Sequence, residues 1–231
     1  MIELQIGENK CSIPNEWNEI DLNTYKDLVR IIYENDFKEP NDELREQDKE
    51  VVDVERQMSN IKLNRKILSY LTKIDESVIN KCNILEMNNA LKLMTEFLNT
   101  QAETKYNNKV KFKFDFKGKT YYFPEMKMHG STFGDYIESA QLEVLAKKSE
   151  GGRMSVVAEQ MAVLCREENE KYNEEKVLKK TKIFGKLKMD IVWDFLFFLT
   201  KQINTYRKNI LTSLKAGNEI TTDTQPNIGK S

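Results

Sequence analysis

Few residues of this chain are of the types that catalyse reactions or bind metals. Its 231 residues include one histidine, His129, and three cysteines. His129 precedes Gly130 ahead of a predicted helix, where it is most simply a turn residue. Cys11, Cys82 and Cys165 lie far apart, without a CxxC pair or the spacing of metal ligands. We therefore predict no catalytic residue, no metal site and no cofactor, and we expect the cysteines to be buried free thiols.

Motifs for phosphate and calcium binding are not evident in the sequence either. The double glycine of EGGR (150–153) lacks the Lys-Ser/Thr of a P-loop and the three glycines of a dinucleotide fingerprint. We interpret it as a flexible turn. A site built from carboxylates alone stays open, because acidic residues are numerous, but none has the spacing of an EF-hand.

Nucleic-acid binding is a weaker hypothesis than it first looks. In residues 112–123 aromatic residues alternate with lysines, as in some nucleic-acid-binding sheets, but Asp115 interrupts the pattern. A hairpin that packs on a core also needs its aromatics on one face. The chain has 36 basic and 37 acidic residues, a formal net charge of −1, and this balance gives no general attraction for nucleic acid. The lysines between 179 and 188 are expected on a solvated helix face.

The most apolar stretch is IVWDFLFFL (191–199). It is too short to span a bilayer and contains Asp194, so we expect no contact with membranes and a cytoplasmic type of protein. Because the stretch is apolar nearly all round, we interpret it as a central core helix, with an interface as the alternative.

Two β-hairpins are predicted, about 110 residues apart. They are IELQIGENKCSIP (2–14) and FKFDFKGKTYYFP (112–124), each with period-two alternation, a turn that contains glycine, and a final proline. Three amphipathic helices are predicted after each hairpin: 21–34, 60–74 and 87–99 in the first half, and 130–146, 155–167 and 189–202 in the second. Asp21 or Asn23 is a candidate N-cap of the first helix.

The sequence thus predicts an α+β fold that is mainly α-helical, with an internal duplication of a β-hairpin followed by three helices. The first repeat covers 1–107 with a charged insertion at 34–59, which is expected to extend the helix at 60–74. The second covers 108–202 with an insertion at 167–188, and the two insertions differ as loops do. Chance similarity between amphipathic stretches is the alternative to duplication.

A C-terminal helix and an extended polar tail are predicted in residues 203–231. The apolar stripe of this helix comprises Ile203, Tyr206, Ile210, Leu211 and Leu214. Such a helix with a tail that has nothing to bury favours docking on a partner protein.

The segment SIPNEWNEIDLNTYKDLVRII resembles the opening of small proteins encoded among the tail and head–tail connector genes of Bacteroides-type, crAss-like bacteriophages. The segments GKTYYFPEMKMHGSTFGDYIE and VVAEQMAVLCREENEKYNEEK are similar to the second half of these proteins, including Ala162, Leu164 and Arg166, followed by Tyr172. The chain departs from them at Cys165, where an aromatic residue is usual, and in its C-terminal extension.

The resemblance implies a non-enzymatic virion protein of the tail or connector, made in the bacterial host cytoplasm. Such a protein would form a homo-oligomeric ring or barrel and bind other tail or neck proteins. It carries over no catalytic residue. A tail assembly chaperone that holds a partner tail protein is the alternative, and a nucleic-acid-binding regulator is a third, less favoured hypothesis.

Overall fold

The computed structural model describes residues 1–38, 46–99, 112–124, 133–149 and 152–201. Within these residues the protein is mainly helical with two small antiparallel hairpins, which confirms the predicted mainly helical α+β class. The elements are β1 (Ile2–Ile6), β2 (Asn9–Ile13), the 3-10 helix η1 (Trp17–Glu19), α1 (Leu22–Asn35), α2 (Glu46–Thr72), α3 (Glu76–Ile79), α4 (Ile84–Leu98), β3 (Lys113–Phe116), β4 (Lys119–Tyr122), α6 (Phe133–Lys148), α7 (Arg153–Leu164), α8 (Glu174–Phe184) and a last helix at 189–201. The predicted C-terminal helix and tail at 203–231 lie outside the described residues, and the duplication stays a prediction.

Both hairpins form where the alternation predicts them. In the first, Leu4 pairs with Cys11 and Ile2 with Ile13, and Ile6 and Ile13 are fully buried. This hairpin packs one face on α2 and α4, as period-two alternation requires.

The second hairpin turns through Lys117 and Gly118, which both have positive φ angles, 49° and 75°. This is the type I′ pattern, in which glycine relieves the left-handed strain. Beyond the turn Phe114 pairs with Tyr121, and both side chains enter the core. The next residue, Tyr122, exchanges two backbone hydrogen bonds with Arg166, so the hairpin is tied to the segment after α7.

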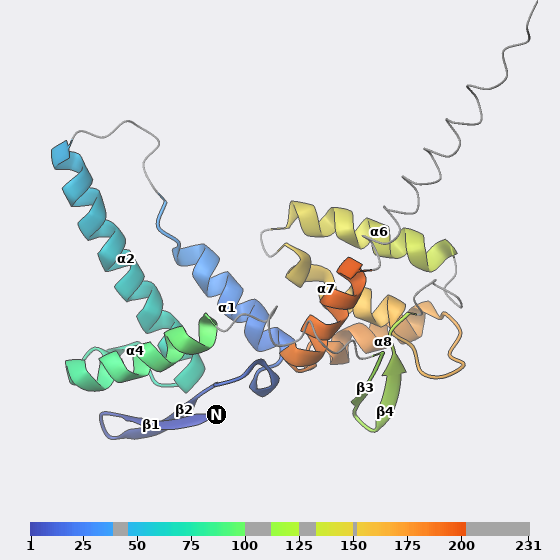
Figure 1. Cartoon of the computed structure of the whole chain (residues 1–231), viewed down its shortest axis with the longest axis horizontal. Helices are drawn as coiled ribbons and strands as arrows, with labels where there is room; N and C mark the ends of the chain where they lie inside the picture. The colour runs from blue at the N-terminus through green and yellow to red at the C-terminus, as the bar shows by residue number, and fades with distance from the viewer. Residues whose placement is uncertain (39–45, 100–111, 125–132, 150–151, 202–231) are drawn as a thin grey trace, which may run out of the picture.

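Two groups of elements lie on either side of α1 (Figure 1). The hairpin β1–β2, α2 and α4 form one group. The hairpin β3–β4, α6, α7, α8 and the last helix form the other. We call these groups the N-terminal half and the C-terminal half. Buried side chains from both halves belong to one continuous hydrophobic core.

The backbone joins the two halves where α1 begins. The first N–H groups of a helix have no acceptor within the helix. Here carbonyl groups of the turn after α8 accept hydrogen bonds from two of them. Leu22 N donates to the Leu187 carbonyl (2.9 Å) and Asn23 N to the Gly185 carbonyl (2.8 Å). In return Met189 N, at the start of the last helix, donates to the Ile20 carbonyl (3.1 Å).

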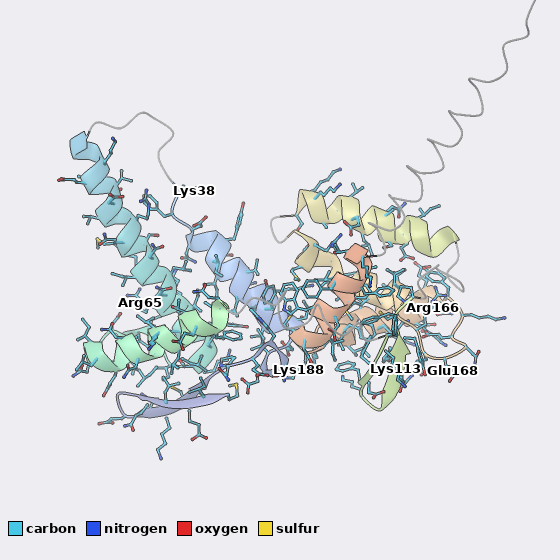
Figure 2. The ribbon with its side chains drawn as sticks, in the orientation of Figure 1. Lys38, Arg65, Lys113, Arg166, Glu168 and Lys188 are labelled. Atoms are coloured by element: carbon cyan, nitrogen blue, oxygen red, sulfur yellow. The ribbon has the colours of Figure 1, made fainter. Side chains whose placement is uncertain are left out.

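Side chains complete this cap and extend it. The Asp21 carboxylate accepts from Thr24 N at 2.8 Å, which confirms Asp21 as the N-cap. A Cβ at Gly185 would overlap the Asn23 side-chain amide, so a larger residue there would displace the Asn23 side chain. Lys188 lies between the halves in Figure 2, and its Nζ donates to the Glu19 carbonyl.

An aromatic cluster covers the same junction. The ring of Trp17 lies 5.6 Å from Tyr25, 4.8 Å from Phe97 and 6.1 Å from Trp193. Tyr25 and Trp193 also meet edge to face at 5.7 Å. We call residues 20–23 and 185–189, together with Trp17, Tyr25 and Trp193, the joint. Trp17 touches a helix of each half, because Phe97 comes from α4 and Trp193 from the helix at 189–201.

The last helix is a core helix, as predicted. Its residues Val192, Phe195, Leu196, Phe198 and Leu199 are all buried. The segment 167–188, in contrast, does not behave as a surface loop. It contains α8, and its residues Val177, Phe184 and Leu187 belong to the core, because the aromatic rings of the second hairpin need Phe184 as a partner.

The long helix expected through 60–74 is also confirmed, since α2 runs from Glu46 to Thr72. Its C-terminal part carries the buried Ile67 and Leu68. The Tyr70 hydroxyl donates to Asp27 at 2.8 Å and fastens α2 to α1. Burial, with a further contribution from Asp27, raises the pKa of Tyr70 to about 12.

We expect Trp17→Ala to lower the free energy of unfolding by about 3–5 kcal/mol, because it opens a cavity in the joint. Urea denaturation measures this loss. Tyr33→Ala, at an exposed position near the other end of α1, is the control and should cost less than about 1 kcal/mol. Equal losses for the two variants would show that the joint has no special weight.

Tyr70 predicts a loss of stability at high pH. Between the ordinary tyrosine pKa of 10.0 and about 12, the unfolded chain releases the Tyr70 proton while the folded chain keeps it. Stability therefore falls as pH rises through this window. Tyr70→Phe should make the fall shallower in urea denaturation at pH 9 to 12, and an unchanged slope would contradict the assignment.

Candidate functional site

The most unusual surface of the described residues lies on α2. Val51, Val54, Met58 and Ile61 are 59%, 55%, 53% and 66% exposed. Their spacing of three, four and three residues places them on one side of the helix, and we call these four residues the α2 face. The N-terminal part of α2 that carries them reaches beyond the rest of the N-terminal half (Figure 1).

Packing among the described residues does not explain this exposure. Val52, the neighbour of Val51, is only 9% exposed, so the same helix turns one apolar side inward and leaves another outward. Single exposed apolar residues are ordinary, but a row at heptad spacing is typical of a helix that pairs with another helix. The row ends at Arg65, whose Nε donates to Glu76 at 2.8 Å. Figure 2 shows Arg65 where α2 meets the other elements of its half.

Charges are distributed unevenly around the α2 face. Glu50 and Glu55 are exposed beside its N-terminal part, and Lys62 beside its C-terminal end. In the N-terminal part of α2 the rim of the face is therefore acidic.

A second exposed apolar surface lies on α6. Ile137, Val144 and Leu145 are 41%, 52% and 54% exposed, and we call them the α6 face. The helix ends in Lys147 and Lys148, both exposed, so the rim of this face is basic at its C-terminal end. Basic residues in the last turn also suit the negative end of the helix dipole.

A groove of about 750 Å³ runs along α1 towards the start of α7. Its polar groups already bond to one another: Lys26 Nζ donates to the Ser155 carbonyl at 3.0 Å, and Arg30 pairs with Asp27 at 2.9 Å. Burial lowers the pKa of Lys26, and the charge of Glu159 opposes the shift. These contacts cross-link α1 to its neighbours, and we interpret the groove as structural.

The lysines between 179 and 188 are not all solvated, so that expectation is wrong for Lys180. Its side chain is buried, and Nζ lies 3.4 Å from the Glu170 carboxylate and 3.0 Å from the Cys165 carbonyl. Desolvation lowers its pKa, and Glu170 opposes the shift. The Glu170 carboxylate also accepts from Glu167 N at 2.9 Å. The pair holds the loop between α7 and α8.

The cysteines are free thiols, and only one of them is fully buried. Cys165 is 0% exposed, and burial raises the pKa of its thiol. Cys11 and Cys82 are half-buried, so the expectation of burial is confirmed for Cys165 alone. The other residues singled out by sequence, His129 and the first two residues of 150–153, lie outside the described residues.

The aromatic hairpin turns mostly inward. Phe114, Tyr121 and Phe123 are buried, whereas Phe112 and Tyr122 are 53% and 38% exposed, so the expectation of inward-facing aromatics is wrong for these two. Within the described ranges, no three His, Cys, Asp or Glu side chains gather as they would around a metal ion.

Sequence reasoning missed both apolar faces. The signal for the α2 face was present as V-x-x-V-x-x-x-M-x-x-I within residues 51–61, but the many charges of this segment suggested a solvated insertion. The α6 face had no such signal, because apolar residues occur on several sides of that helix.

Comparison with protein-family models, curated proteins and solved structures found no match to this chain. In the part of the chain that the structure describes, no helix is both long enough and apolar enough to cross a membrane.

Adjacent valines of α2 test whether the α2 face is free in the folded chain. Val51→Ala and Val54→Ala should change the free energy of unfolding by less than about 0.5 kcal/mol, since alanine favours the helix and no packing is lost. Val52→Ala should cost about 1–2 kcal/mol because its side chain is buried. Chemical denaturation of dilute protein makes the comparison, and a large loss at Val51 would place this face inside the fold.

Proposed function

We propose that this chain is a non-enzymatic structural protein of a bacteriophage tail or head–tail connector, and that it assembles into a ring or barrel with copies of itself. The observation that carries the proposal is the α2 face, four apolar side chains that the chain exposes at heptad spacing. The resemblance of residues 12–32 to tail and connector proteins supplies the setting.

The two-half construction suits a scaffold of this kind. Each half has a hairpin followed by helices, and we propose that the halves arose by duplication, with 1–107 and 108–202 as the repeats. The joint supports such a role, because the joined halves can present two surfaces at a defined spacing. Residues 203–231 would then contact other tail or neck proteins in the virion.

A tail assembly chaperone is the second candidate. The α2 face would also suit a transient partner, since the flexible side chain of the exposed Met58 adapts to different surfaces. The two functions differ in what the purified protein does alone: a structural subunit associates with itself, and a chaperone waits for its partner.

Mass spectrometry of purified virions tests the proposal. We expect the protein in stoichiometric amount with other tail proteins, and sedimentation velocity of the purified protein should show oligomers that grow with concentration. Presence only in infected-cell lysate, with a monomer at all concentrations, would favour the chaperone. If the monomer shifts nucleic acid in an electrophoretic mobility assay, the nucleic-acid-binding regulator is favoured.

A further inference from the structure

The α2 face and the α6 face lie in different halves of the molecule. Figure 1 shows α2 at one end of the long axis and α6 in the opposite half. We infer that the α2 face of one copy binds the α6 face of the next copy, so that subunits associate head to tail. This inference rests on the proposed function.

This arrangement follows from what each type of contact can build. A surface that binds its own equivalent forms a closed dimer and stops there. Two different surfaces on one molecule form a chain of subunits, which closes into a ring when the rotation per subunit allows it. A ring therefore needs a second, different face, and the α6 face supplies one within the described residues.

The charges at the rims of the two faces favour this pairing. Glu50 and Glu55 border the α2 face, and Lys147 and Lys148 end the α6 face. Pairing α2 with α6 can bring these opposite charges together. Pairing two α2 faces in parallel would instead bring Glu50 near Glu55.

Both faces are small, so they suit an assembly in which each subunit makes more than one contact. The α2 face has four apolar side chains and the α6 face three. One such contact is small for a stable complex. In a ring every subunit makes two contacts, and closure adds stability because the last contact is intramolecular.

Mixing two variants tests the inference. The first variant, Val54→Asp/Ile61→Asp, places two aspartates on the α2 face. The second, Val144→Asp/Leu145→Asp, places two on the α6 face. Association through the altered face would bury these unpaired charges. Each variant alone should be monomeric, with affinity weakened about a hundredfold or more. At a high protein concentration, which a single small contact requires, an equimolar mixture should form a one-to-one heterodimer, because one intact α2 face and one intact α6 face remain. Sedimentation velocity separates these species from wild-type oligomers.

Two control variants add the same charge elsewhere. Asn60→Asp is exposed on α2 but lies away from the α2 face, and Leu178→Asp replaces an exposed apolar residue of α8. Both should oligomerise like the wild type. Circular dichroism should show that all variants stay folded, since every substituted side chain is exposed.

Charge reversal provides a test that leaves the apolar residues intact. Glu50→Lys/Glu55→Lys and Lys147→Glu/Lys148→Glu should each weaken association about tenfold, and the chain with all four substitutions should recover it. Recovery depends on direct opposition of the two rims, so a general effect of net charge would not produce it.

Other results overturn the inference in distinguishable ways. If the α6 variant still dimerises through α2, the contact is isologous. If the mixture forms no heterodimer although the wild type oligomerises, the α6 face has another occupant, for example residues 203–214 of its own chain. In the second case the proposed function stands, whereas an isologous α2 contact leaves the structural role but requires another surface to build the ring. A wild-type protein that is monomeric and absent from virions overturns both proposals.

Discussion

The fold depends on an exchange of hydrogen bonds between helix ends. The start of α1 has N–H groups without intrahelical partners, and the turn after α8 has free carbonyls. Leu22 and Asn23 donate to Leu187 and Gly185, and Met189 donates back to Ile20. Because these groups lie more than 160 residues apart in the chain, their pairing fixes the two halves to each other. Ile20, Leu22, Leu187 and Met189 are all buried, so water has little access to the bonds that they make.

The joint fixes the separation between the exposed surfaces of the two halves. If the halves moved freely, an apolar face on α2 and another on α6 would have no fixed separation, and repeated contacts would not build a regular assembly. With the joint formed, α1 links both halves, and the buried pair of Lys180 and Glu170 holds the loop that precedes α8. The buried contacts of the interior thus set the geometry of the surface.

Much of the architecture could be predicted from local pattern. Alternation located both hairpins, Asp21 was a candidate cap, and the apolar run at 191–199 was recognised as a core helix. These features depend on residues close together in the chain. The environments of Lys180, Phe112 and Phe184 were not predictable in this way. Lys180 is buried because Glu170 and the Cys165 carbonyl lie beside it, and α8 belongs to the core because Phe184 meets the rings of a hairpin some 60 residues earlier.

The sequence by itself determined the class of fold, the positions of most helices and strands, and the scarcity of residues suited to catalysis. It could not determine which apolar residues stay outside. Val51 and Val52 are chemically identical neighbours, and only the tertiary structure buries one and exposes the other. The same holds for the joint, since a free backbone N–H looks the same at every helix start. The tertiary structure decided both, because burial and hydrogen bonding depend on which distant segments meet.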